Sequence, residues 1–291
     1  MIRVDSLRKE YGGFVAVEES SFIVEPGEVF GIVGPNGAGK TTTLKAIAGL
    51  LEPTSGLVEI KGTPSTEAST RHRLGFLPEE SPLYEEMTAR SYLRFFADLY
   101  DVPRDVATHR IEDTLDRLDL QHRDRPLGDV SKGMKRKVAI ARSLVNDPAV
   151  VVYDEPASGL DPLTTSYVVE FTRELARDGK TVVFSAHNLY HVEEVCDRVA
   201  IMNEGRIVAK GTLEELRTEY GGTEYHVFTT VDVPDAEVDD DRYLSVVEDM
   251  AAVDRIRTEA DDRGGRIEDI RTKDPSLERL FLEFASDGEG R

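Results

Sequence analysis

The chain has 291 residues and a mass of 32.4 kDa, which is more than one compact domain usually needs, so we expect one large domain and a smaller one. No apolar run approaches the roughly 18 residues that a membrane-spanning helix requires. The first residues lack the apolar stretch of a secretory signal, and the single Cys196 excludes an internal disulfide framework. These features predict a cytoplasmic protein that does not cross a membrane.

The charge balance is acidic, with 56 acidic and 36 basic residues and a formal net charge of −20. Affinity for nucleic acids comes mostly from basic surface, so this balance argues against a DNA or RNA partner. Residues 221–291 hold 20 acidic and 9 basic residues and therefore carry −11 of the total. Only 10 of the basic residues are lysine. An acidic surface poor in lysine resembles proteins adapted to high salt, and an ordinary acidic cytoplasmic protein is the alternative.

Apolar runs of strand length alternate with helical patterns through residue 220, which predicts a layered α/β domain. The clearest strands lie at 29–33, 149–153 and 181–185. Residues 81–130 follow a helical pattern instead, with Tyr92, Phe95, Phe96 and Leu99 at helical spacing, and predict a helical insert. These aromatics fit either a binding groove or core packing, and we favour core packing.

The last part of the chain is expected to form a separate small domain. Residues 198–211 predict a hairpin with its turn at 203–205, and a boundary follows at 220–222. Beyond it we expect a strand at 223–233, an acidic turn at 234–241, a strand at 266–271 and a last helix at 276–284. Between the acidic turn and the second strand, helical spacing predicts a helix that carries Tyr243, Val246, Val247, Met250 and Val253.

A glycine-rich loop follows the predicted strand at 29–33 and precedes a helical run. Its residues are Gly34, Pro35, Asn36, Gly37, Ala38, Gly39, Lys40 and Thr41, in the strand, loop, helix context of a phosphate-binding loop. Glycines let backbone N–H groups turn toward phosphates, and the helix N-terminus adds partial positive charge. We expect Lys40 to contact the β- and γ-phosphates and the Thr41 hydroxyl to bind Mg²⁺. A glycine turn that merely precedes a helix is the alternative.

Two acids end the predicted strand at 149–153. Asp154 is placed to hold Mg²⁺ through water, and the next residue, Glu155, to polarise an attacking water. A capped strand end with two acids facing solvent is the alternative. The loop and the acids predict nucleotide binding without choosing among kinases, GTPases, recombinases and transport ATPases.

Three further stretches narrow that choice. VSKGM at 130–134 opens a helix, SGLD at 158–161 follows the acid pair, and SAH at 185–187 ends the next strand. In this order and spacing, residues 1–220 resemble the ATP-binding subunit of ABC transporters, with its Walker A, Q-loop, signature, Walker B, D-loop and switch histidine. The stretches LPEESPLYEEMTA, VSKGMKRKVAIARSL and PSLERLFLEF are similar to the ATPases of ABC-2-type, drug and sodium exporters.

The resemblance implies a fold and an assembly. The fold is an α/β P-loop ABC cassette at 1–220, with a mixed sheet core, an N-terminal antiparallel β part and a helical subdomain at about 81–145. A small acidic α+β accessory domain follows at 221–291. Two cassettes are expected to dimerise head to tail around two ATP molecules, each held by the loop of one subunit and the signature of the other. The partner is a second copy or a homologous ATPase subunit.

The resemblance also implies roles for single residues. Glu155 matches the catalytic base, acting with Lys40 and His187, although a core histidine is the ordinary reading of His187. Tyr11 matches the aromatic that stacks on adenine, with plain packing as the alternative. The other matched nucleotide contacts are Thr42 in the loop, Ser131 and Gly133 in the signature, Asp161 in the D-loop, and Glu79 in the Q-loop. Mg²⁺ is expected at Thr41, Glu79 and Asp154.

Two positions depart from the family pattern. The signature commonly reads LSGGQ, whereas Lys132 replaces its first glycine here and Met134 its glutamine. The Q-loop glutamine is replaced by Glu79, which keeps an oxygen for the metal and adds a negative charge. Ser131 is also a natural helix N-cap. We interpret the basic residues of the same helix, Lys132, Lys135, Arg136 and Lys137, as a solvated face.

The sequence thus predicts the Mg²⁺-dependent, ATP-hydrolysing motor subunit of an ABC exporter. It is expected to act at the inner face of the membrane beneath separate permease subunits, contacting them through residues 79–87. A soluble ABC ATPase acting on DNA, ribosomes or protein assemblies is the alternative, and the single cassette, the missing heptad repeat and the acidic charge argue against it.

Overall fold

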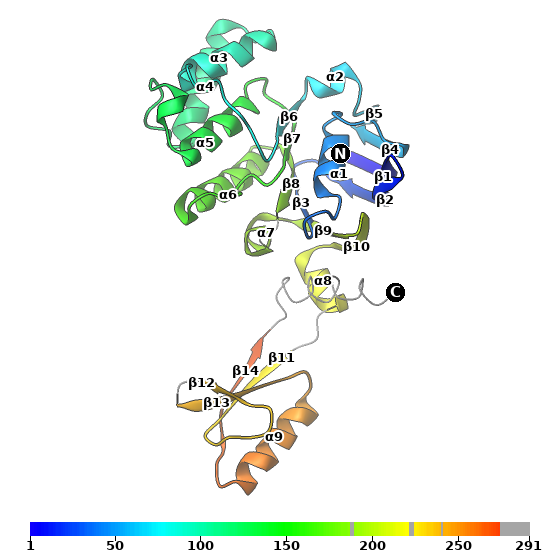
Figure 1. Ribbon diagram of the computed structural model, residues 1–291, viewed down its shortest axis with the longest axis vertical. Coiled ribbons are helices and arrows are strands. Elements are labelled where there is room, and N and C mark those ends of the chain that lie inside the picture. Colours follow the sequence, from blue (N-terminus) through cyan, green and yellow to red (C-terminus); the bar gives the residue numbers. More distant parts are fainter. Residues whose placement is uncertain (187–188, 221–223, 240, 274–291) are drawn as a thin grey trace. The chain divides into compact units, whose positions relative to one another are not determined.

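The protein is described by a computed structural model that covers residues 1–186, 189–220, 224–239 and 241–273 (Figure 1). Its contacts divide the chain into two compact units, the first ending at Thr212 and the second beginning at Leu213. Within the described ranges, none of the helices combines the length and the apolar character needed to cross a bilayer.

A six-stranded sheet forms the centre of the first unit, in the order β10-β9-β3-β8-β7-β6. All its strand pairs are parallel except the β9–β10 hairpin. The bounds are β3 (Val29–Val33), β6 (Leu74–Leu77), β7 (Val150–Tyr153), β8 (Thr181–Ala186), β9 (Arg198–Asn203) and β10 (Arg206–Gly211). Strands β3, β7 and β8 are buried along their whole length, and accordingly β3 and β7 are continuous apolar runs and β8 is apolar apart from Thr181 and Ser185. The strands and the hairpin predicted from these runs are confirmed.

A second, antiparallel sheet lies beside the first, in the order β2-β1-β4-β5. Its strands are β1 (Ile2–Tyr11), β2 (Phe14–Val24), β4 (Ser55–Ile60) and β5 (Thr63–Pro64). One apolar core joins both sheets to α1 (Lys40–Ile47), which contributes Leu44 and Ile47. That core fixes α1, and so also the glycine loop before it. The predicted α/β fold with a mixed sheet and an N-terminal antiparallel part is confirmed.

Further helices belong to the first unit. They are α2 (Ala68–Arg71), α3 (Ala89–Leu99), α4 (Arg104–Arg117), α5 (Lys132–Arg142), α6 (Pro162–Arg177) and α7 (Leu189–Val195). Of these, α6 and α7 contact strands of the six-stranded sheet. Helices α3, α4 and α5 gather in one group, away from the antiparallel sheet (Figure 1). The core packing expected for the aromatics of α3 is confirmed for Tyr92, which is 1% exposed, whereas Phe96 is half-buried and Phe95 is 39% exposed. Leu99, which shares their spacing, is 60% exposed.

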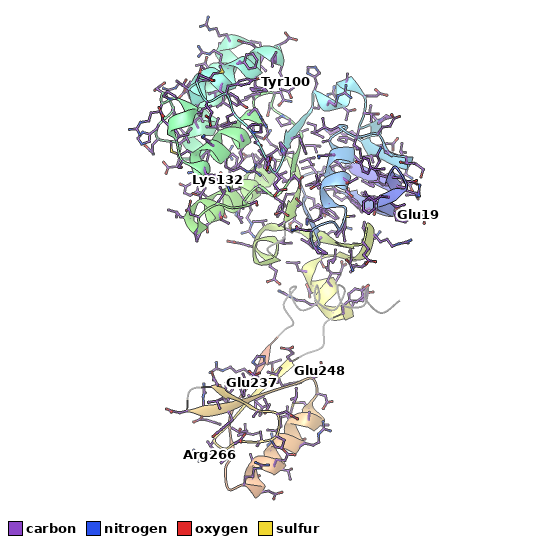
Figure 2. All side chains as sticks on the ribbon, in the orientation of Figure 1. Glu19, Tyr100, Lys132, Glu237, Glu248 and Arg266 are labelled. Carbon is purple, nitrogen blue, oxygen red and sulfur yellow. The ribbon has the colours of Figure 1, made fainter. Side chains whose placement is uncertain are left out.

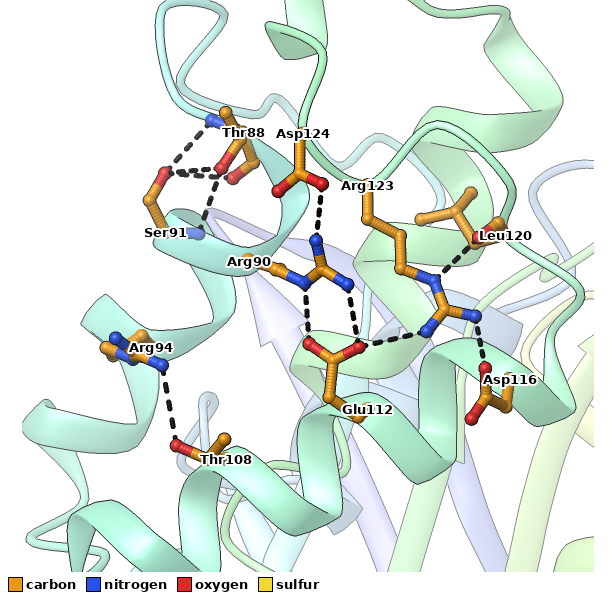
Figure 3. A network of polar contacts seen from close by, with 10 residues as sticks. All are labelled: Thr88, Arg90, Ser91, Arg94, Thr108, Glu112, Asp116, Leu120, Arg123 and Asp124. Atoms are coloured by element: carbon orange, nitrogen blue, oxygen red, sulfur yellow. Dashed lines mark hydrogen bonds and ion pairs between the residues drawn. The ribbon is translucent and has the colours of Figure 1, made fainter.

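A network of ion pairs ties this helical group together (Figure 3). Arg90 of α3 donates two hydrogen bonds to Glu112 of α4, at 2.6 and 3.0 Å, and also pairs with Asp124. Arg123 donates to the same Glu112 carboxylate at 3.0 Å and pairs with Asp116. Since Glu112 accepts from two guanidinium groups, it links α3, α4 and the segment that follows α4.

The second unit is a four-stranded antiparallel sheet with a helix on one face. Its elements are α8 (Leu213–Tyr220), β11 (Glu224–Thr229), β12 (Glu237–Asp239), β13 (Arg242–Val247), α9 (Met250–Asp262) and β14 (Ile267–Lys273), and the strand order is β12-β13-β11-β14. Val227 of β11 packs against Val253, Ile256 and Ala260 of α9. The unit therefore has an apolar core of its own.

The helix predicted to start at Tyr243 is wrong over its first part. Residues 242–247 form β13, which pairs with β11, and the helix begins only after Asp249, whose side chain caps it by accepting from the Ala252 N–H at 2.6 Å. Tyr243, Val246 and Val247 do fall at helical spacing, but aromatic and β-branched residues also favour strands, and pairing with β11 decides between the two. The strand expected at 266–271 is confirmed as β14, and the helix expected at 276–284 lies outside the described residues.

Candidate nucleotide-binding site

The glycine loop runs from the end of β3 into the first turn of α1. Two of its glycines are needed for steric reasons. A Cβ on Gly34 would lie 2.4 Å from the Met202 carbonyl oxygen, and one on Gly39, where φ is +100°, would lie 2.6 Å from the Ala16 carbonyl oxygen. No larger residue fits against the neighbouring strands at these positions. These two glycines therefore let the ends of the loop pack closely on the neighbouring strands, while a Cβ on Gly37, between them, would meet no atom within 4 Å.

Lys40 is the first residue of α1 and is 7% exposed. Its ammonium group donates to the carbonyl oxygens of Gly34 at 2.8 Å and Pro35 at 3.1 Å, so its charge lies inside the curve of the loop. The same nitrogen lies 3.7 Å from Oε1 of Glu155. The structure thus brings together the loop lysine and the second acid of the pair, two residues that the sequence analysis assigns to catalysis.

The acid pair follows β7, and a serine at the neighbouring strand holds it. Ser185 Oγ donates to Oδ1 of Asp154 at 2.7 Å and accepts from the backbone N–H of Glu155 at 2.9 Å. Asp154 is 1% exposed and Ser185 fully buried. Glu155 adopts a left-handed backbone conformation, with φ +47°, which turns the chain sharply just after Asp154. The alternative of two acids facing solvent is therefore wrong.

The donor set of this region fits Mg²⁺. Asp154 presents a carboxylate and Thr41 a hydroxyl, and oxygen ligands are the ones this hard cation prefers. Within the described residues, no cluster of three or more His, Cys, Asp or Glu forms a closed metal cage. Mg²⁺ in nucleotide sites is usually held by one or two protein ligands together with phosphate oxygens and water, so an open donor set suits it.

Arg136 of α5 is a residue whose place the sequence interpretation missed. It is 8% exposed rather than part of a solvated face, and its guanidinium donates to backbone carbonyls near Glu79 and the acid pair. Desolvation by burial lowers its pKa to about 10. Helical spacing places Arg136 on the same face of α5 as Ile140 and Ser143, four and seven positions later, and both of these residues are also buried. Arg136 therefore lies on the inward stripe of α5.

The signature opens α5, as expected. Ser131 is the N-cap, and its hydroxyl accepts from the Met134 N–H at 3.2 Å. Lys132, which replaces the usual glycine, is exposed on this turn (Figure 2), and its ammonium group lies over Gly159, where an added Cβ would be 2.3 Å from the nitrogen. Among the residues described here, no hydrogen bond or ion pair joins Ser131 or Gly133 to the glycine loop.

The D-loop lies against the signature. Asp161 caps α6 by accepting from the N–H of Thr164 at 3.0 Å and from its hydroxyl at 2.7 Å. These hydrogen bonds lower the pKa of Asp161. A Cβ on Gly133 would lie 3.0 Å from the Thr164 hydroxyl, so the start of α5 packs closely on the start of α6.

The other predicted site residues differ in their exposure to solvent. Tyr11, at the end of β1, is 47% exposed and carries the Lys9 ammonium 5.1 Å from its ring centroid. Glu79 is exposed just after β6. Thr42 is half-buried in α1. His187 lies outside the described residues.

The fold and the loop together define a P-loop nucleotide-binding protein. Residues 17–158 match the ABC transporter family. The chain is 42% identical to the ABC transporter ATP-binding protein NatA of Bacillus subtilis over 69% of this chain and 83% of that protein. It is 30% identical to the linearmycin resistance ATP-binding protein LnrL of the same species over 98% of both chains. The chain belongs to the ATP-binding subunits of ABC transporters and is an ATPase.

Solved structures agree with this assignment. The ATP-binding subunit of an ABC transporter matches at a TM-score of 0.69 and 34% identity, over 76% of this chain and 93% of that one. A dimeric structure of the cassette MJ0796 matches at a TM-score of 0.68 and 25% identity, over 73% of this chain and 99% of that one. The same cassette has also been solved as a dimer in a post-hydrolysis state with ADP and Pi.

Proposed function

We propose that this chain is the motor subunit of an ABC exporter, dimerising head to tail around two ATP molecules beneath separate membrane subunits. The observation that carries the proposal is the arrangement of Lys40, Asp154, Glu155 and Ser185, which places a loop cation and a positioned acid pair within one small region. The dimer of the similar MJ0796 cassette supports the assembly. The name of a further relative supports export: the Nod factor export ATP-binding protein I of Burkholderia orbicola is 38% identical over 71% of this chain and 69% of that protein.

The chemistry is hydrolysis of the γ-phosphoryl group of ATP. Water attacks the γ-phosphorus, Glu155 accepts its proton, and the bond to the bridging oxygen of ADP breaks. Lys40 offers its positive charge to the β- and γ-phosphate oxygens as charge develops on them. Thr41, Asp154 and Glu79 would hold Mg²⁺, which neutralises phosphate charge when bound. We also propose adenine stacking on Tyr11, phosphate contact by His187, and cross-dimer contacts from Ser131, Gly133 and Asp161.

A cavity beside the Q-loop supports contact with a permease. It has a volume of about 600 Å³, and its lining includes Leu50, Phe76, Pro78, Phe96 and Tyr100. Leu50 is 58% exposed, so an apolar surface is open to a partner here. Arg71, His72 and Arg142 line the same cavity. An amphipathic permease helix with an acidic end fits this chemistry.

The experiment that tests the proposal is Glu155→Gln. This change keeps the shape of the side chain and removes the basic carboxylate, so turnover should fall by roughly 10²- to 10⁴-fold while ATP still binds. Because ATP is bound but not cleaved, the dimer should accumulate with ATP, which light scattering measures. Glu170→Gln, an exposed carboxylate of α6, is the control. A Glu155→Gln protein that hydrolyses normally and stays monomeric in ATP would contradict the proposal.

Partner capture separates export from the alternative of a soluble ABC ATPase. The tagged chain, purified from gently solubilised membranes, should bring down a permease. Recovery of ribosomes, DNA or an assembly factor without any membrane subunit would favour the alternative.

A further inference from the structure

All five N–H groups of the Arg136 guanidinium are used, and every acceptor is a backbone carbonyl. Nε donates to Pro156 at 2.7 Å. Nη1 donates to Pro78 and to Glu79, both at 2.8 Å. Nη2 donates to Asp154 at 3.1 Å and to Glu155 at 2.8 Å. A guanidinium has five donors, so this buried cation is fully satisfied without a hydrogen bond to any carboxylate.

The five acceptors belong to two loops that leave neighbouring strands. Residues 78–79 follow β6 and 154–156 follow β7, and these strands pair in parallel with Leu77 opposite Tyr153. The Asp154 N–H also donates to the Leu77 carbonyl at 2.8 Å, so the strands separate only beyond this point. Arg136 lies where they separate and joins both loops to α5, the helix that begins at the signature.

The strained backbone of Glu155 is held from both sides. Its φ of +47° is an unusual conformation for a residue with a side chain, and such conformations persist only when the surroundings fix them. Ser185 accepts from its N–H at 2.9 Å, and Arg136 donates to its carbonyl at 2.8 Å. Together these two contacts set the direction in which the Glu155 side chain leaves the backbone.

We propose that Arg136 is a positioning residue for ATP hydrolysis, which orients the Glu155 loop and the Glu79 loop relative to each other and to the signature helix. This inference rests on the proposed roles of Glu155 and Glu79. In this proposal Arg136 acts by holding the two loops in position and does not itself contact the nucleotide.

Lysine cannot replace arginine in this role. An ammonium group carries the same charge but has three donors and no planar fork, so at most three of the five carbonyls keep a partner. Arg136→Lys therefore separates the charge from the geometry. Arg136→Met removes every donor and keeps an extended side chain.

The test compares kcat and KM for MgATP in the full chain, with melting temperature and ATP binding in EDTA as measures of folding. For Arg136→Lys we expect kcat to fall about 100-fold with KM within about threefold of wild type, because a misplacement of about 1 Å is enough for such a loss. For Arg136→Met the fall in kcat should be at least as large. Arg110→Lys is the matched control, since Arg110 of α4 donates to the Val145 carbonyl at 2.6 Å, outside the two loops. It should leave kcat unchanged.

Hydrogen exchange in Arg136→Lys gives a second measurement. The backbone amides of residues 77, 79, 80, 154, 155 and 157 should exchange faster, while those of β3 keep their wild-type rates; Pro78 and Pro156 carry no amide hydrogen. The proposal is overturned if kcat of Arg136→Lys stays within about twofold of wild type, if Arg110→Lys loses kcat equally, or if neither Arg136 variant folds, since that assigns the residue to stability alone. Normal hydrolysis by Glu155→Gln would instead contradict the proposed base, whatever Arg136 does.

Discussion

Single side chains hold the acid pair by binding backbone as well as carboxylate. Ser185 contacts Asp154 and the N–H of Glu155, while Arg136 contacts the carbonyl oxygens of both acids. Buried polar groups with all partners in place fix one geometry, and losing one partner leaves the others unpaired in a medium of low dielectric constant. The proposed base is therefore sensitive to residues that never touch nucleotide.

Ser185→Ala tests this sensitivity. It leaves Oδ1 of Asp154 and the Glu155 N–H without their shared partner, so the free energy of unfolding should fall by about 1–3 kcal/mol and turnover should fall as well. Urea unfolding and steady-state ATPase assays measure the two effects. Ser143→Ala is the control, because Ser143 is also buried and donates to the Ile140 carbonyl at 2.7 Å, but does not contact the acids. If both variants lose stability and turnover alike, Ser185 has no special role in the site.

The elements that sequence predicts best are those whose signal is local. Strands β3 and β7 are continuous apolar runs between turn residues, β8 has an apolar run at 182–184, and the glycine loop has its own spacing, so these elements were predictable. Residues 242–247 were not, because their pattern suits a helix as well as a strand and the choice depends on pairing with β11, a contact the local sequence does not contain. For Arg136, helical spacing indicates the inward face of α5 but not the partners, because its five acceptors are backbone atoms of loops that are distant in the sequence.

The stabilisation that the ion pairs between α3 and α4 provide should depend on pH, because it requires the ionised carboxylate of Glu112. Hydrogen bonds from Arg90 are the main cause that lowers its pKa below 4.5, and those from Arg123 add to it. A carboxyl whose pKa is lower in the folded state stabilises the fold above its unfolded pKa, and this contribution disappears as pH falls through the folded value. The Glu112 network should therefore stabilise the protein at neutral pH and lose its effect below about pH 4.

Glu112→Gln isolates this effect. At pH 7 the variant should unfold with a free energy about 0.5–1 kcal/mol below wild type, a modest figure because the pairs are partly exposed to solvent. The difference should shrink as pH drops below 4.5, which denaturant unfolding at several pH values measures. Glu170→Gln, whose partner Arg177 is on the same exposed helix face, should show little difference at any pH. If the difference in unfolding free energy between wild type and Glu112→Gln stays constant down to pH 3, ionised Glu112 is not the source of the stabilisation.

At the scale of the whole molecule, the net charge of −20 is the dominant feature. At about 0.01 M salt the screening length is roughly 30 Å, so carboxylates across the surface repel one another, whereas near 1 M it is about 3 Å and only neighbours interact. Self-repulsion destabilises a compact state, and ATP adds further negative charge to a dimer interface. The fold and the proposed dimer should both be weakest in dilute buffer.

A KCl series from dilute to molar separates a surface adapted to high salt from an ordinary acidic one. In the first case, melting temperature and ATPase activity both rise toward molar KCl, because screening relieves repulsion within the fold and between subunits. In the second case, melting temperature still rises somewhat, but activity falls at molar salt as the ion pairs between ATP and cations such as Lys40 weaken. Both quantities are measured on the same samples, with sucrose of matched osmolality in place of KCl as the control for exclusion effects that do not depend on charge. Activity that peaks at low salt would reject the adaptation to high salt and leave the ATPase assignment untouched, since the acid pair and the glycine loop do not depend on the surface charge.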